Sequence, residues 1–151
     1  MLTNRSNGFQ EAGREIGKAL FSPAYTPVVP VANNKTNRSF TDHIIETAML
    51  QGAEAGMTEL AKGKSGERLL EARVNRKAYE LLQGGSAKQA IEVFRLNVHA
   101  FPKSGNTYDS LGEAYLTSGD TTLAIENYRT SLALDPENKN AEEVLQRLQG
   151  K

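Results

Sequence analysis

Apolar residues recur at helical spacing along the last third of the chain. Within Asn106–Ser118, the residues at i, i+3, i+4 and i+7 are Tyr108, Leu111, Gly112 and Tyr115, which places them on one face of a helix. A second stripe runs along Thr121–Leu134 and consists of Leu123, Ala124, Tyr128, Ser131 and Leu132. The pattern predicts two consecutive amphipathic helices. We expect Ala124 to face Gly112, because two small residues would let the helices approach closely.

Turn-forming residues stand where these helices should end. Gly119 follows the first helix, and glycine freely adopts the positive φ of a helix C′ position. Thr121 or Thr122 is then expected to cap the second helix. Pro136 stops the second helix, since the residue before a proline is biased away from the helical region.

The same pattern occurs once more, 34 residues upstream. The matched pairs are Gly85 and Gly119, Ala90 and Ala124, Ile91 and Ile125, Phe94 and Tyr128, Arg95 and Arg129, and Pro102 and Pro136. The first helix of the upstream copy, residues 71–104, departs from the pattern at Val74 and Lys77. A fixed period of this length predicts a stack of helix pairs.

Further helices are expected on both sides of the two repeats. Residues 138–149 read as an amphipathic capping helix, which would close the open end of the stack. Upstream, residues 40–50 and 53–61 read as a degenerate helix pair broken at Gln51-Gly52. Residues 63–66 separate that pair from a long helix over 67–83. The predicted fold class is therefore an all-α solenoid of tandem helix-turn-helix units.

The repeat resembles the tetratricopeptide repeat (TPR). That family's pattern runs aromatic-x2-Leu-Gly-x2-Tyr, followed by Gly, Ala, an aromatic, a small residue and Pro. It is matched by Tyr108, Leu111, Gly112, Tyr115, Gly119, Ala124, Tyr128, Ser131 and Pro136. The resemblance implies a protein-binding or scaffolding module in which the first helix of each repeat lines a groove.

Polar residues that the core does not use are the expected lining of that groove. They are Asn75, Arg76, Tyr79, Gln83, Asn106, Asp109, Glu113 and Thr117, and the row continues along the capping helix with Glu143 and Arg147. Members of the family that clamp a C-terminal carboxylate use Lys and Asn at such places. Asp109 and Glu113 would repel a carboxylate, so a neutral or basic peptide, or an adjoining domain, is the expected partner. An ordinary solvated polar face is the alternative interpretation.

The first forty residues have a different character. Residues 1–21 are interpreted as a strand and helix remnant, with an apolar face of Phe9, Ala12, Ile16, Ala19 and Leu20. Residues 22–39 contain Pro23, Pro27, Pro30 and several Asn, a composition typical of an extended linker. The repeat domain is expected to occupy residues 40–151.

The chain also resembles the C-terminal end of bacterial β-lactamase-related serine hydrolases that carry a helical-repeat extension. The resemblance is carried by Leu2-Thr3-Asn4, by the proline-containing linker and by the Asp-Ser-Leu-Gly-Glu-Ala-Tyr string at residues 109–115. It implies an accessory domain of an esterase-like enzyme, periplasmic or secreted. If Met1 is the true start, a cytoplasmic location is expected instead.

Composition narrows the remaining functions. Eighteen basic and eighteen acidic residues cancel, so neither nucleic acid nor membrane is an expected partner. Cysteine is absent, Ser-x-x-Lys does not occur, and His43 and His99 lie in no ligand pattern. We therefore expect no catalytic residues, metal or cofactor in this chain. Self-association through uncovered helix faces is a further alternative.

Overall fold

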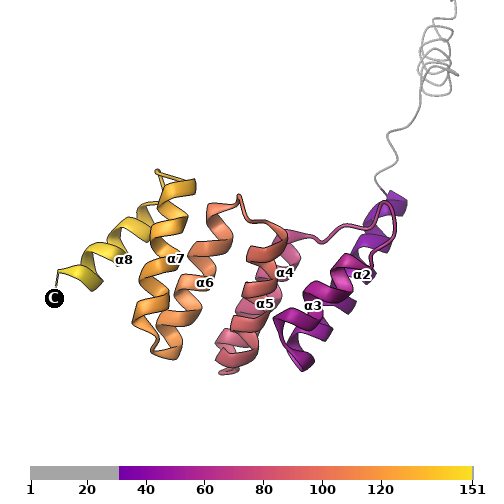
Figure 1. Ribbon diagram of the computed structural model, residues 1–151, viewed down its shortest axis with the longest axis horizontal. Coiled ribbons are helices and arrows are strands. Elements are labelled where there is room, and N and C mark those ends of the chain that lie inside the picture. The colour runs from indigo at the N-terminus through magenta and orange to yellow at the C-terminus, as the bar shows by residue number, and fades with distance from the viewer. Residues whose placement is uncertain (1–30, 151) are drawn as a thin grey trace, which may run out of the picture. The chain divides into compact units, whose positions relative to one another are not determined.

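The computed structural model describes residues 31–150. These residues form seven α-helices and no strand, namely α2 (Val31–Gln51), α3 (Ala53–Ala61), α4 (Glu71–Gln83), α5 (Ala87–Ala100), α6 (Gly105–Ser118), α7 (Thr121–Leu134) and α8 (Lys139–Gln149). From α4 to α8 each helix packs against the next, and α3 packs against α5 (Figure 1). The prediction of an all-α solenoid is confirmed. The predicted remnant at residues 1–21 and the first part of the predicted linker lie outside the described residues.

In the hairpin of α6 and α7, α7 has the predicted bounds and α6 begins one residue earlier than predicted, at Gly105. Gly119 ends α6 in the left-handed region with φ 89°, and the following amide of Asp120 donates to the Tyr115 carbonyl at 2.9 Å. The cap of α7 is Asp120, whose side chain accepts a hydrogen bond from the Leu123 amide at 3.0 Å. The prediction of a threonine cap was therefore wrong. Thr121 already belongs to the first helical turn, so the residue before it takes the capping position.

The atoms nearest to Gly112 belong to the ring of Tyr128, whereas we expected the small residue Ala124 to face it. A Cβ atom at Gly112 would lie 3.2 Å from two atoms of the Tyr128 ring. Ala124 is fully buried, but the three atoms nearest to Gly112 all belong to Tyr128. The glycine therefore serves to admit the aromatic ring of α7 against the backbone of α6.

The hairpin of α4 and α5 supplies half of the buried residues of the larger core. Its fully buried side chains include Val74, Ala78, Ala90, Val93, Phe94 and Leu96. The ring of Tyr79 packs edge-to-face on Phe94, with centroids 5.1 Å apart and an interplanar angle of 80°. A second, smaller cluster of Ala124, Tyr128, Ala141 and Leu145 joins α7 to the capping helix α8.

The helix α4 begins at Glu71, four residues later than the predicted start at residue 67. Leu70 is extended, with φ −109° and ψ 102°, and its amide donates to the Thr41 hydroxyl of α2 at 3.1 Å. Leu69 is buried in the core. The helical pattern of 67–70 is thus overridden by tertiary contacts with α2, which a single sequence does not display.

The degenerate pair is present as α2 and α3, but its first helix is longer than predicted. The break falls at Gly52, with φ 94°. The helix begins at Val31 and not at Phe40, so residues 31–39 of the predicted linker are helical. Asn and Thr in that stretch are weak helix formers, but none of them breaks a helix, and Pro30 precedes the first turn, where a missing N–H costs nothing.

The two members of this pair approach closely and are tied to the next repeat. A Cβ atom at Gly56 of α3 would lie 2.9 Å from the Cβ of Ala48 in α2. The first amide of α3, that of Ala53, donates to the Glu92 carboxylate of α5 at 2.7 Å. Because the N-cap residue Gly52 has no side chain, Glu92 supplies the acceptor from a distant helix.

Candidate functional site

One predicted groove residue of α4, Tyr79, is hydrogen-bonded to one of α6, Glu113. The hydroxyl of Tyr79 donates to Oε2 of Glu113 at 2.7 Å and lies 3.3 Å from the Ser110 hydroxyl. Burial raises the pKa of Tyr79 well above its usual range, and the Glu113 carboxylate adds to the effect. We call the surface formed by α4, α6 and α8 on this side the first-helix face.

A similar link joins α6 to α8. Oδ1 of Asp109 accepts from the side-chain amides of Asn138 and Asn140, both at 3.0 Å. Asn138 also caps α8 by accepting from the Ala141 amide at 3.1 Å. One repeat earlier, Asn106 donates to Oε1 of Glu71 at 3.3 Å. Asp109 and Asn106 therefore stabilise the fold, because their hydrogen bonds link successive repeats.

A pocket of about 540 Å³ opens between α6 and α8. It is lined by Glu113, Leu116, Thr117, Tyr128, Asn140, Glu143, Val144 and Arg147. Four predicted groove residues, Glu113, Thr117, Glu143 and Arg147, thus line one pocket. Burial, followed by the carboxylates of Asp109 and Glu113, raises the pKa of Tyr128 to about 12. We call this cavity the α6–α8 pocket.

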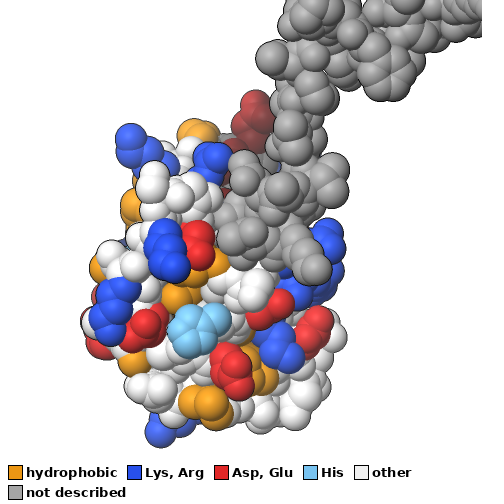
Figure 2. Space-filling view, turned by 90° about the vertical axis from the view of Figure 1, so that its right-hand side faces the viewer, with side chains coloured by type: hydrophobic (Ala, Val, Ile, Leu, Met, Phe, Trp, Pro, Cys, Tyr) orange, Lys and Arg blue, Asp and Glu red, His pale blue; other side chains and the backbone are white. Residues whose placement is uncertain are grey.

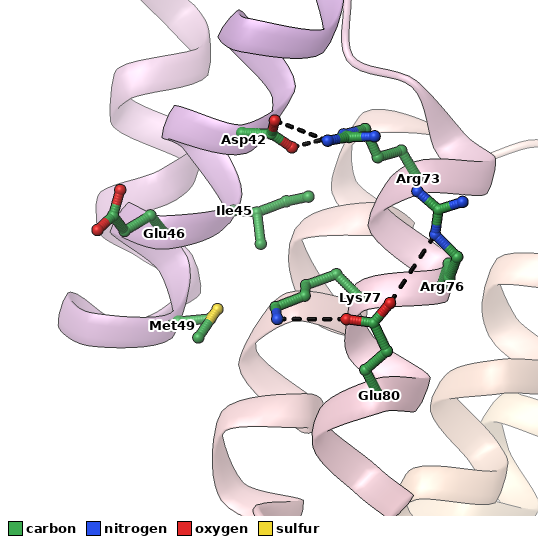
Figure 3. Close-up of a pocket in the computed structure, with 8 residues that line it drawn as sticks. All are labelled: Asp42, Ile45, Glu46, Met49, Arg73, Arg76, Lys77 and Glu80. Atoms are coloured by element: carbon green, nitrogen blue, oxygen red, sulfur yellow. Dashed lines mark hydrogen bonds and ion pairs between the residues drawn. The ribbon is translucent and has the colours of Figure 1, made fainter. Parts of the chain in front are cut away.

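A second pocket, of about 410 Å³, lies between α2 and α4 (Figure 3). Five of its six charged residues form ion pairs within the described part of the chain, and Glu46 is the exception. Arg73 donates two hydrogen bonds to the Asp42 carboxylate, one of them from Nη2 at 2.7 Å. These bonds hold the pKa of Asp42 below its usual range. Lys77 pairs with Glu80 at 3.3 Å, and Arg76 lies 3.9 Å from the same carboxylate.

The remaining predicted residues are dispersed. Arg76 lines the pocket between α2 and α4 and not the one between α6 and α8. Gln83 is exposed at the end of α4. Oδ1 of Asn75 is buried and has no hydrogen-bond partner among the described residues. The ten predicted residues therefore do not all gather at one pocket.

The sequence did not assign four residues of the α6–α8 pocket to a site, namely Leu116, Tyr128, Asn140 and Val144. Tyr128 was interpreted as core alone, although its fully buried ring also borders the pocket. Asn140 stands 34 residues after Asn106, so the period contained the signal for it. The pocket between α2 and α4 was also missed, because α2 belongs to the degenerate pair, in which the period gives no alignment.

Charge on the described surface is mixed. At the α2–α3 end, Figure 2 shows basic and acidic side chains interspersed, without a large patch of one sign. Within residues 31–150, no group of three or more His, Asp or Glu side chains is placed to hold a metal ion. None of the described helices is long and apolar enough to cross a membrane.

A family model for the tetratricopeptide repeat matches residues 105–138. This span contains α6, α7, Gly112, Gly119 and Tyr128, whose packing is given above. Residues 105–138 form a tetratricopeptide repeat. The α4–α5 hairpin, which shares its period, packs beside this TPR as the preceding unit of the solenoid.

Curated relatives match the chain over part of its length. Superkiller complex protein 3 of Homo sapiens is 35% identical over 63 residues, which is 42% of this chain and 4% of that protein. Cellulose synthase operon protein C of Escherichia coli is 37% identical over 59 residues, or 39% of this chain and 5% of that protein. The Mus musculus Superkiller complex protein 3 is 32% identical over 94 residues, or 62% of this chain. The chain spans only about a twentieth of the length of these relatives.

Proposed function

We propose that this chain is a protein-interaction module of the TPR type and that it binds a peptide segment of its partner along the first-helix face. The presence of a TPR supports the proposal, because stacked helix pairs offer an extended surface to a partner. The α6–α8 pocket on this face is polar, and Glu113 and Glu143 make it locally acidic. A neutral or basic peptide segment is therefore favoured over an acidic one.

The observation that carries the proposal is the α6–α8 pocket. It is a hollow on the first-helix face that side chains from α6, α7 and α8 line together. The ties around it, from Tyr79 to Glu113 and from Asp109 to Asn138 and Asn140, hold its walls at fixed positions. A site whose walls are already ordered loses little conformational entropy when it binds a ligand.

A selection from a random peptide library tests the proposal. The full chain is immobilised, phage-displayed peptides are selected against it, and the dissociation constants of synthetic copies are measured by calorimetry. We expect binders that compete with one another and weaken at least fivefold with Thr117→Arg, which places a bulky cation in the pocket. Arg129→Ala, an exposed change on α7 outside the pocket, is the matched control. Failure to enrich any peptide, or equal weakening by both variants, would contradict the proposal.

The module is proposed to be non-catalytic by itself. An assay with a generic activated ester tests this directly, and turnover that survives repeated purification would contradict it. A role as the C-terminal accessory domain of a β-lactamase-related hydrolase also stays a prediction, and the comparisons reported above lend it no support. An in-frame Ser-x-x-Lys upstream of Met1 in the gene would support that role.

Self-association is the other proposal that the sequence left open. Light scattering across a range of concentrations tests it. A mass that rises with concentration would support pairing of chains, and a constant monomer mass would remove the idea.

A further inference from the structure

Two positions of the repeat are filled differently in its two copies. In the α4–α5 hairpin, Tyr79 of the first helix covers Phe94 of the second helix with its ring. Thirty-four residues on, the same two positions hold Glu113 and Tyr128. Among the described residues, no aromatic ring stacks on Tyr128. Its outer side instead borders the α6–α8 pocket.

The hydroxyl of Tyr128 has no protein partner there. The residue is only 1% exposed, and no hydrogen bond joins its hydroxyl to another described residue. Phenylalanine at the equivalent position 94 shows that the fold itself does not need the hydroxyl. The pocket therefore presents an unpaired hydroxyl that can accept a hydrogen bond from a ligand.

The carboxylates beside this hydroxyl are also available. Oε2 of Glu113 is held by Tyr79, whereas Oε1 of Glu113 has no hydrogen bond within residues 31–150. Glu143 and Arg147 line the opposite wall on α8, and no described residue pairs with either. Two carboxylates against one guanidinium leave the pocket with a net negative charge. A ligand cation would therefore be favoured there over an anion.

We propose that the α6–α8 pocket takes the side chain of an arginine from the partner's peptide segment. Glu113 on α6 and Glu143 on α8 accept hydrogen bonds from the guanidinium, and the Tyr128 hydroxyl accepts another at the floor. A planar group with five donors fits acceptors that approach from several directions better than a lysine ammonium does. The inference rests on the proposed function and names the chemical group that the same face recognises.

The positive charge of Arg147 limits how many cations the pocket can bind. Arg147 lies on α8 one turn after Glu143 and lines the same pocket. It repels a second cation and so limits the pocket to one guanidinium. Arg147→Ala is therefore expected to tighten arginine binding, whereas the loss of either carboxylate weakens it.

A nuclear magnetic resonance titration of the full ¹⁵N-labelled chain tests the inference. The probes are N-acetyl-arginine methylamide, its lysine counterpart, the uncharged isostere N-acetyl-citrulline methylamide and N-acetyl-glutamate methylamide. We expect saturable shifts at Glu113, Tyr128 and Glu143 with arginine, in the millimolar range usual for a single side chain, on the order of −4 kcal/mol. Weaker shifts are expected with lysine and none with citrulline or glutamate.

Matched variants distinguish binding in the pocket from a general effect of negative charge on the chain. Glu143→Gln and Tyr128→Phe should each weaken arginine binding about fivefold or more. Glu142→Gln, the neighbouring exposed carboxylate on α8 that pairs with Gln146, removes the same charge outside the pocket and should leave binding within twofold. Equal effects of Glu142→Gln and Glu143→Gln, or stronger shifts with glutamate than with arginine, would overturn the inference.

The outcome also separates this inference from the proposed function. Library peptides that bind the first-helix face without an arginine preference, together with no saturable arginine shifts, would overturn the inference alone. The absence of any selected peptide would overturn the proposed function.

Discussion

Tyr79 covers Phe94 in the α4–α5 hairpin, whereas in the α6–α7 hairpin Glu113 leaves Tyr128 beside an open pocket. The inward positions of the two hairpins are alike, because both second helices bury one aromatic ring completely. The side chains at the outward positions of the first helices, Tyr79 and Glu113, differ in size and charge. Packing therefore constrains the inward positions to similar residues, and the outward ones are free to carry specificity.

The largest contrast should appear when each buried ring is removed. Phe94→Ala and Tyr128→Ala should each lower the free energy of unfolding by about 3–5 kcal/mol. We expect the larger loss at Phe94, because it belongs to the larger core cluster and also supports the Tyr79 ring. Urea unfolding followed by circular dichroism measures both. His99→Ala, an exposed change on α5, is the control, and a larger loss at Tyr128 would contradict the comparison.

The next contrast concerns Ala78 and Gly112, which occupy equivalent places on the first helices of the two hairpins. Gly112→Val should destabilise the fold by about 1–3 kcal/mol, since its side chain would overlap the Tyr128 ring. Ala78 occupies the equivalent place in α4 and already carries a Cβ atom. Ala78→Gly should therefore cost about 1 kcal/mol through lost helix propensity. Urea midpoints of both variants test this, and a neutral or stabilising Gly112→Val would show that the close approach to Tyr128 is not needed.

The two second helices also begin differently. Asp120 caps α7 through the Leu123 amide, whereas Ser86, at the equivalent position before α5, makes no side-chain cap bond. Asp120→Ala should cost about 1 kcal/mol of stability. Ser86→Ala should stay within about 0.5 kcal/mol of the parent chain. Thermal and urea unfolding of the pair measure the difference, and equal losses would contradict the assignment of the caps.

The smallest effect at neutral pH is expected from Tyr128→Phe, because the hydroxyl has no protein partner. Its influence should appear in alkali. The folded chain keeps Tyr128 neutral until a pH near its pKa of about 12, whereas an unfolded tyrosine ionises near pH 10. Stability from this group is thus complete below about pH 10 and is lost as the pH rises towards 12. The urea midpoint should fall less steeply between pH 9 and pH 11 in Tyr128→Phe than in the parent chain, and identical slopes would contradict the account.

The periodic helices were predictable from the sequence, and so were most of their ends. Residues 106–118 and 121–134 combine a clear apolar stripe with Gly119 and Pro136, so local signals agree with the fold. The starts of α2 and α4 were not predictable. Leu70 leaves the helical conformation to meet Thr41, a contact between residues far apart in the chain.

The candidate site was predictable only in outline. The period identifies the positions on the first helices, which is why Glu113, Thr117 and Arg147 were named and do line one pocket. The period does not show which of these side chains form hydrogen bonds within the fold. Asp109 and Asn106 are bound to other repeats, and Tyr128 reaches the pocket because Gly112 admits its ring.

The most direct test of the difference between the two hairpins is to map where a library-selected peptide binds the ¹⁵N-labelled full chain. The account predicts that the largest amide shifts fall on α6 and α8, around Glu113, Tyr128 and Glu143. It predicts much smaller shifts on α4 around Tyr79 and in the pocket between α2 and α4, where most of the charged side chains are already paired. A footprint centred on α2 and α4, or on the second helices α5 and α7 away from the α6–α8 pocket, would contradict it.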